Sequence, residues 1–227
     1  IMANNKIQDA AQKVEEQLEQ QPSFIEKKAK VITIFLIAVV LGVAGFVLWN
    51  NHYKKPLEDK ASTAIAKGQD FFGAEQYEKA LNGDSINYQG FVKLANEYSG
   101  TKAGNLANLY AGLCYAKLDK WAEAAQYLEK FDTQDDQMIS PAAIGALGNA
   151  YAHLEQLDKA VETLKKAASM ADNNSLSPTY LIQAGEILES QGKKDEALKL
   201  YEEVKAKYYN SMQYQTIDKY IERAKVK

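Results

Sequence analysis

Glycine recurs at a nearly fixed spacing in the second half of the chain, at positions 112, 148 and 185. A large side chain follows each glycine after three residues, and an alanine follows it after twelve. These residues are Tyr115, Tyr151 and Leu188, and Ala124, Ala160 and Ala197. Self-similarity at this period is typical of stacked helical hairpins, in which no single repeat can bury its own apolar face. The sequence therefore predicts an all-α solenoid.

Helix start signals support this repeat. A small residue lets a neighbouring helix approach closely, and the large residue one turn away fills the remaining space. Ser140-Pro141 and Ser177-Pro178 each place a hydroxyl before a proline, which predicts an N-cap and the first helical position. Thr101 follows Gly100, which ends one helix, and is expected to begin the next.

These residues resemble the tetratricopeptide repeat, which shares the small, large and alanine positions. On that pattern the repeats lie near residues 105–138, 141–174 and 178–211. Asn108 stands where the family has tryptophan, and the spacing exceeds the usual length of about 34 residues by a few. The resemblance covers about half of the chain and implies a tetratricopeptide-type helical-hairpin solenoid, a fold that binds other chains.

Helical patterns also flank the repeats. Residues 57–81 and 85–99 are predicted to form a degenerate hairpin (57–99) that caps the stack, split by Asn82-Gly83-Asp84. The apolar positions of its second helix are Phe91, Leu94, Ala95 and Tyr98. Residues 212–226 are predicted to form the opposite cap. Its apolar stripe is Ile217, Tyr220, Ile221 and Ala224.

Residues Val31 to Trp49 contain no charged side chain. At 1.5 Å per residue, this run matches a hydrocarbon core of about 30 Å. Ser23-x-x-Glu26 is a capping box that would begin the helix. The alternatives are a buried core helix, which rarely stays apolar this long, and a cleaved signal peptide, which is disfavoured by the length of the run. We expect a single transmembrane anchor at 31–49, followed by a repeat domain at 50–227.

The orientation of this anchor is only weakly indicated by charge. Four lysines lie within 20 residues on each side, and only the cluster Lys27, Lys28 and Lys30 favours a cytoplasmic N-terminal tail, residues 1–30. The tail has a weak apolar seam that either docks on a partner helix or belongs to a frayed, solvated helix. Its members are Ile7, Ala11, Val14 and Leu18.

Composition argues against several function classes. After residue 50 there are 22 basic and 25 acidic residues, and Arg223 is the single arginine, so nucleic acid is not an expected partner. Cys114 is expected to be a small buried residue, and His52 and His153 lack the companions of a metal site. We therefore expect no catalytic or metal-ligating residues, no cofactor and no small-molecule substrate.

The tail, anchor and repeats together resemble the bacterial YfgM-like ancillary subunit of the SecYEG translocon. The similarity runs from about Leu48 to Ala167, through Trp49-Asn50-Asn51-His52, Phe91–Ala95, Gly112 and Ala124-Ala125. The resemblance implies an inner-membrane signal-anchor protein with its N-terminus in the cytoplasm and its repeats in the periplasm. Such proteins work beside the translocon and periplasmic folding factors.

On the family pattern, nine positions of the repeats face a partner-binding groove. They are Leu109, Leu113, Lys117, Gly145, Asn149, His153, Thr179, Ile182 and Glu186. This mixed surface lacks the Lys/Asn clamp for an acidic C-terminal carboxylate, so capture of a helix or extended segment is the first hypothesis. The alternative is a structural scaffold subunit of another envelope assembly complex.

Overall fold

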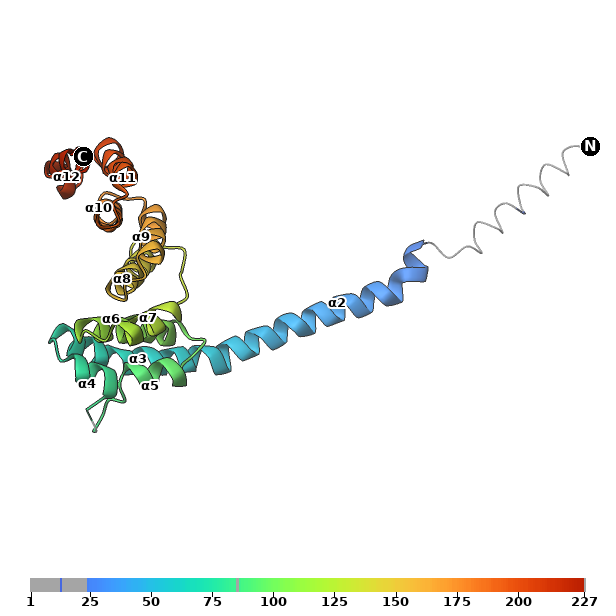
Figure 1. Cartoon of the computed structure of the whole chain (residues 1–227). Coiled ribbons are helices and arrows are strands. Elements are labelled where there is room, and N and C mark those ends of the chain that lie inside the picture. The colour runs from blue at the N-terminus through green and yellow to red at the C-terminus, as the bar shows by residue number, and fades with distance from the viewer. Residues whose placement is uncertain (1–12, 14–23, 85, 227) are drawn as a thin grey trace, which may run out of the picture. The chain divides into compact units, whose positions relative to one another are not determined.

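The structure of the protein is a computed structural model that describes residues 13, 24–84 and 86–226. It divides into two compact units, Ile1–Lys55 and Pro56–Lys227. Helices joined by turns and loops make up the described residues, and no strand occurs among them (Figure 1). The predicted all-α fold is therefore confirmed.

The first unit consists of α2 (Phe24–Trp49) and a π-helical turn, η1 (Asn50–Lys54). The apolar side chains of the predicted anchor are exposed, from Val31 at 67 % to Trp49 at 51 %. One helix in the described residues, Val31–Gly73, is long and apolar enough to cross a membrane, and its most apolar window is 0 % buried. The predicted anchor is thus a candidate membrane span. Ser23 of the predicted capping box and the four residues of the tail seam lie outside the described residues.

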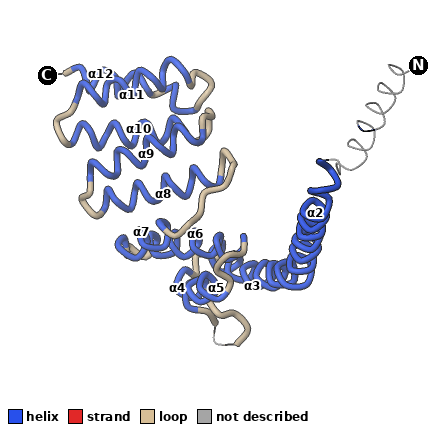
Figure 2. The backbone as a smooth tube through the Cα atoms, turned by 90° about the vertical axis from the view of Figure 1, so that its right-hand side faces the viewer, coloured by secondary structure: helices blue, strands red, loops and turns tan. Residues whose placement is uncertain are grey.

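The second unit is a succession of helical hairpins in which sequence neighbours pack side by side, from α3–α7 at the bottom of Figure 2 to α11 and α12 at the top. Its elements are α3 (Lys55–Gly73), α4 (Tyr77–Asn82), α5 (Phe91–Glu97), α6 (Lys102–Lys117), α7 (Trp121–Glu129), α8 (Ile139–His153), α9 (Leu157–Ala171), α10 (Ser177–Ser190), α11 (Lys194–Lys207), η2 (Met212–Gln215) and α12 (Ile217–Lys225).

One turn geometry recurs four times in this unit. It joins α3 to α4, α6 to α7, α8 to α9 and α10 to α11. The turn residue with positive φ is Glu75, Asp119, Glu155 or Gly192. The N–H of the next residue donates to the carbonyl of Phe71, Tyr115, Tyr151 or Leu188, over 2.9 Å in every case. Because all four hairpins close in this way, α3 and α4 form a further repeat that the sequence pattern did not identify.

The small residues of the motif pack as their spacing predicts. Ala124, Ala160 and Ala197 are all 0 % exposed. A Cβ added at Gly112 would lie 2.6 Å from Leu128 Cγ, too close for two carbon atoms. The glycine of each hairpin therefore allows its first helix to contact the second helix directly.

The first hairpin differs because its second helix is interrupted. The predicted helix 57–81 is divided between α3 and α4, and the predicted helix 85–99 begins only at Phe91. Gly83 and Gly90 have φ of 94° and 89°, and at both positions an added Cβ would collide with backbone atoms. Phe91, on the far side of this interruption, is 0 % exposed and occupies the space beside Gly68. It takes the packing role that Leu128 has beside Gly112.

Helix starts were predicted partly correctly. Thr101 is the N-cap of α6, and its hydroxyl accepts a hydrogen bond from Gly104 N over 2.9 Å. Glu58 of α3 accepts bonds from the N–H groups of Lys102 and Ala103, both over 2.8 Å. The carboxylate therefore satisfies two of the free donors that every helix start leaves, and it joins α3 to α6.

The predicted serine caps are wrong. Neither α8 nor α10 has a side-chain cap at its first residue, and both Ser140 and Ser177 are 0 % exposed. Ser140 Oγ donates to Asp136 Oδ2 over 2.6 Å, and Ser177 Oγ donates to the Ala168 carbonyl over 2.8 Å. Both hydroxyls donate to residues earlier in the chain, because burial leaves them no solvent partner. Asp136 and Asn173 bind the amides near these helix starts instead.

The C-terminal cap agrees with its predicted stripe. Ile217, Ile221 and Ala224 are at most 6 % exposed, and Tyr220 packs against the same core. Lys205 Nζ and Asp218 Oδ1 form an ion pair over 2.6 Å between α11 and α12. Cys114 is 0 % exposed, as predicted for a small core residue.

Candidate functional site

The predicted groove residues lie on the first helix of each of three hairpins. α6 carries Leu109, Leu113 and Lys117; α8 carries Gly145, Asn149 and His153; α10 carries Thr179, Ile182 and Glu186. Helical spacing of three to four residues places the three members of each set on one face of their helix. The repeat turns hold these helices in equivalent positions, so we call the nine positions together the first-helix face.

Two members of the first-helix face belong to the core. Leu109 and Ile182 are each 7 % exposed, and they pack in the clusters between neighbouring hairpins. Gly145 is also buried, because a Cβ there would meet the ring of Tyr180. These three positions shape the face but offer little area to a partner.

On α6 and α8, the accessible members of the face are Leu113, Lys117, Asn149 and His153. Leu113 is half-buried and packs with one side against the core, so its other side remains free for an apolar contact. Asn149 is half-buried, whereas Lys117 and His153 are exposed. Small half-buried side chains accompany them on α8. These are Ala142, Ala146 and Ala152.

His153 stacks on Trp121, an arrangement that sequence reasoning missed. The ring centroids are 3.7 Å apart and the rings are parallel, with an interplanar angle of 0°. Trp121 is the first residue of α7, and it also packs against the core cluster between α6 and α9. The repeat places the start of the second helix of one hairpin, here α7, beside the end of the first helix of the next hairpin, here α8. That rule is the only sequence signal from which this contact could have been found.

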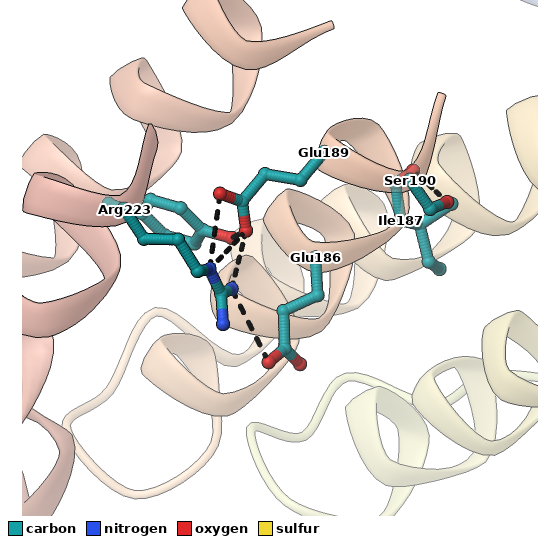
Figure 3. Close-up of polar contacts among 6 residues, drawn as sticks. Glu186, Ile187, Glu189, Ser190 and Arg223 are labelled. Carbon is teal, nitrogen blue, oxygen red and sulfur yellow. Dashed lines mark hydrogen bonds and ion pairs between the residues drawn. The ribbon is translucent and has the colours of Figure 1, made fainter. Parts of the chain in front are cut away.

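The α10 members of the face are engaged by the C-terminal segment. Gln213 Nε2 donates to Thr179 Oγ1 over 2.9 Å. Arg223 of α12 lies 3.7 Å from Glu186 Oε1 and forms a closer, two-nitrogen contact with Glu189 (Figure 3). A partner that used Glu186 would therefore compete with Arg223.

Glu189 is the centre of this polar cluster. Its side chain is only 12 % exposed, and it accepts a further bond from Tyr201 Oη over 2.9 Å. Burial raises the pKa of Tyr201, and the neighbouring Glu189 carboxylate raises it further. The hydrogen bond to Glu189 also raises the pKa of the Arg223 guanidinium. The raised pKa values keep the Tyr201 hydroxyl protonated and the Arg223 guanidinium charged, and the contacts of the cluster fix α12 to α10, which is a structural role.

The described residues do not assemble a metal site. No group of three or more histidine, cysteine, aspartate or glutamate side chains within residues 24–84 and 86–226 is placed to hold an ion. Burial raises the pKa of the Cys114 thiol to about 12, which keeps it protonated and poorly nucleophilic. What the first-helix face can do chemically is contact another chain through apolar and amide groups.

The comparisons with known proteins agree with this architecture. Two crystal structures of the putative kinesin light chain from Podosopora anserina, with nearly identical TPR-like repeats, are similar; one carries the Q17M change. Each has a TM-score of 0.54 and 14% sequence identity and covers 74% of this chain; the chain covers 85% and 86% of theirs. At this identity the likeness concerns the fold alone.

The sequence itself gives the family. No curated protein sequence matched the chain. The family described as "Tetratricopeptide repeat-like domain" matches residues 23–221, which is most of the chain. The protein belongs to the family of tetratricopeptide repeat-like domains.

Proposed function

We propose that the protein is a membrane-anchored protein–protein interaction module that captures partner segments on the first-helix face. The observation that supports this proposal is that Leu113, Asn149 and His153 are accessible on this face and have small side chains of α8 beside them. Apolar and amide groups on a rigid helical support suit the binding of a helix or an extended segment. The family fold supports this class of function, because stacked repeats present extended binding surfaces.

The anchor is assigned to α2. Its apolar side chains are exposed along the helix, and water is an unfavourable surrounding for so large an apolar surface. On the resemblance to the YfgM-like translocon subunits, we place the N-terminus in the cytoplasm and residues 50–227 in the periplasm. The partners are then translocon components, periplasmic chaperones or envelope proteins in transit. Catalysis is not part of this proposal.

Crosslinking in intact membranes tests the first-helix face. Leu113→Glu places a carboxylate where a partner's apolar side chain would be buried, and burying an unpaired charge is unfavourable. We expect the variant to lose its crosslinked partners while its thermal unfolding is unchanged, because Leu113 is half-buried and can direct a new carboxylate to solvent. Lys165→Glu, on an exposed position of α9, is the control and should keep them.

The pattern of captured chains separates the two functional classes. Many partly folded envelope proteins would support transient capture, whereas one stoichiometric partner would indicate the scaffold alternative. A Leu113→Glu protein that folds and keeps every partner would exclude the first-helix face as the binding surface.

Protease added to spheroplasts tests the orientation. The repeat domain should be degraded if it lies in the periplasm, and the N-terminal tail should be protected. If the repeat domain were protected under the same conditions, it would lie in the cytoplasm, which the protease cannot enter in intact spheroplasts. The orientation would then be the reverse of the one proposed. Lysed cells serve as the control that the domain is cleavable.

A further inference from the structure

The loop that interrupts the first hairpin displays an isoleucine. Ile86 is 84 % exposed, although hydrogen bonds hold Asp84 and Tyr88 near it. Asp84 Oδ1 accepts bonds from the N–H groups of Ile86, Asn87 and Tyr88, over 3.0, 2.8 and 2.8 Å. Tyr88 is buried and its hydroxyl donates to the Ala80 carbonyl over 2.8 Å. The loop is thus fixed from within, and the side chain of Ile86 takes no part in fixing it.

One exposed lysine shares a depression with this isoleucine, and two more share a depression with its neighbour Asn87. Ile86, Asn87 and Lys93 line one shallow depression. Asn87 also lines a neighbouring depression together with Lys60 and Lys67. Asn87 is therefore shared by the two depressions. We call the side chains Ile86, Lys60, Lys67 and Lys93 the loop surface.

The loop surface carries three positive charges. Lys60, Lys67 and Lys93 are exposed and form no ion pair in the part of the chain that the structure describes. The carboxylates beside them are Asp59 and Asp84; Asp84 accepts three backbone amides, and the charge of Lys67 helps to lower its pKa. Some lysines of the later repeats do form ion pairs. The lysines paired with acids in the later repeats are Lys159, Lys193, Lys205 and Lys207.

We propose that the loop surface docks on the anionic headgroups of a phospholipid membrane, with Ile86 inserted among them. An apolar side chain flanked by lysines suits this boundary, because lysines are attracted to anionic lipid and the apolar group leaves water. The inference rests on the proposed anchoring through α2. Only ten residues lie between Trp49 and Lys60, so the chain keeps Lys60 within about 40 Å of Trp49 in any arrangement.

A fluorescent label at position 86 tests this contact in the full chain. The Ile86→Cys protein is labelled with an environment-sensitive fluorophore and reconstituted into vesicles of phosphatidylcholine with phosphatidylglycerol. Cys114 is 0 % exposed and should not react. Met212→Cys is the matched control, because Met212 is 85 % exposed but lies among ion-paired residues near α12.

We expect quenching of the label at position 86 by lipid-borne quenchers, and none at position 212. Quenching should disappear in vesicles of phosphatidylcholine alone and in high salt. Changing all three lysines to glutamine should lower the ratio of docked to free loop by about 100-fold. Three results would overturn the proposal: a label at position 86 that stays in water, equal quenching at position 212, or quenching at position 86 that is unchanged when the three lysines are replaced.

Extraction of the same vesicles with alkaline carbonate separates this inference from the anchoring on which it rests. A protein that is released was never anchored, and the proposed function then fails at its first step. A protein that is retained while the label at position 86 stays in water refutes only lipid docking. The loop surface would then be free for a protein partner.

Discussion

The first hairpin and the three that follow have the same turn geometry, but their second helices differ. In α8–α9 the second helix runs unbroken from Leu157 to Ala171. In the first hairpin α4 stops at Asn82, and α5 resumes at Phe91 after a loop. The glycine of each hairpin is nevertheless covered by a large side chain, Leu164 at Gly148 and Phe91 at Gly68. What the repeat requires is therefore a filled space beside the glycine, and an unbroken helix is only the commonest way to provide it.

The two regions also differ in how their charges are used. Ion pairs tie the later repeats to their neighbours, as between Lys193 and Asp158 over 2.8 Å. Around the interrupted hairpin the acidic groups bind backbone amides instead, as Glu58 does at the start of α6. Lys60, Lys67 and Lys93 form no ion pair within the described residues, although the charge of Lys67 helps to lower the pKa of Asp84. This region has the features of a contact surface, whereas the C-terminal hairpins have those of a closed stack.

The largest expected effect comes from removing the side chains that cover the glycines. Phe91→Ala should lower the free energy of unfolding by about 3–5 kcal/mol, and Leu164→Ala by about 2–5 kcal/mol, because each leaves a cavity at a fully buried site. Chemical denaturation measures both. Tyr209→Ala, at a residue 63 % exposed, is the control and should have little effect. If Phe91→Ala behaved like the control, α5 would not substitute for the missing part of the second helix.

Overfilling the alanine positions should have the next largest effect. Ala80 and Ala160 occupy equivalent positions and are both 0 % exposed. Leucine at either position should destabilise the fold by about 1–3 kcal/mol, since the two helices of the hairpin must move apart. Ala122→Leu, on an exposed position of α7, is the control for the added side chain. If Ala160→Leu lowered the free energy of unfolding and Ala80→Leu did not, the first hairpin would be packed more loosely than α8–α9.

The sequence predicted the regular hairpins well because their contacts are local. Gly148, Tyr151 and Ala160 lie within one repeat, so their spacing alone specifies how α8 meets α9. The first hairpin was predicted only as a degenerate cap over 57–99, because Phe91 is separated from Gly68 by the inserted loop, which removes the expected spacing. Gly68, Phe71 and Ala80 do keep the spacing of the glycine, the large residue and the alanine, so the sequence carries a signal for this hairpin.

The first-helix face was harder to predict. Spacing places Leu109 and Leu113 on one face of α6, but it does not say how closely the next hairpin packs. The structure shows Leu109 buried by that packing and Leu113 left half-buried. The contact of Arg223 with Glu186 depends on α12, whose attachment to α10 follows from no repeat pattern.

A smaller effect is expected at the junction between α3 and α6. Glu58→Ala removes the acceptor of two backbone N–H groups and should destabilise the fold by about 1 kcal/mol. Faster hydrogen exchange of the Lys102 and Ala103 amides would locate the loss. Asp59→Ala is the control, since the Asp59 side chain makes no hydrogen bond within the described residues. Equal exchange in the two variants would mean that solvent replaces Glu58 without loss.

The smallest effect concerns the pH dependence of the loop. Hydrogen bonds from Asn87, Tyr88 and Ile86 favour the ionised carboxylate and hold the pKa of Asp84 below its ordinary value of 3.8. Because this pKa is lowered on folding, the stabilisation is complete above pH 3.8 and is lost as pH falls through the lowered value. A carboxyl carbon titration followed by NMR should give a midpoint below 3.8, with the three amide resonances shifting at the same pH. Asp84→Asn should abolish the amide transition and leave the α8–α9 resonances unchanged. A midpoint at or above 3.8 would show that these amides do not hold the carboxylate in solution, and that the loop surface lacks the internal support on which its display of Ile86 depends.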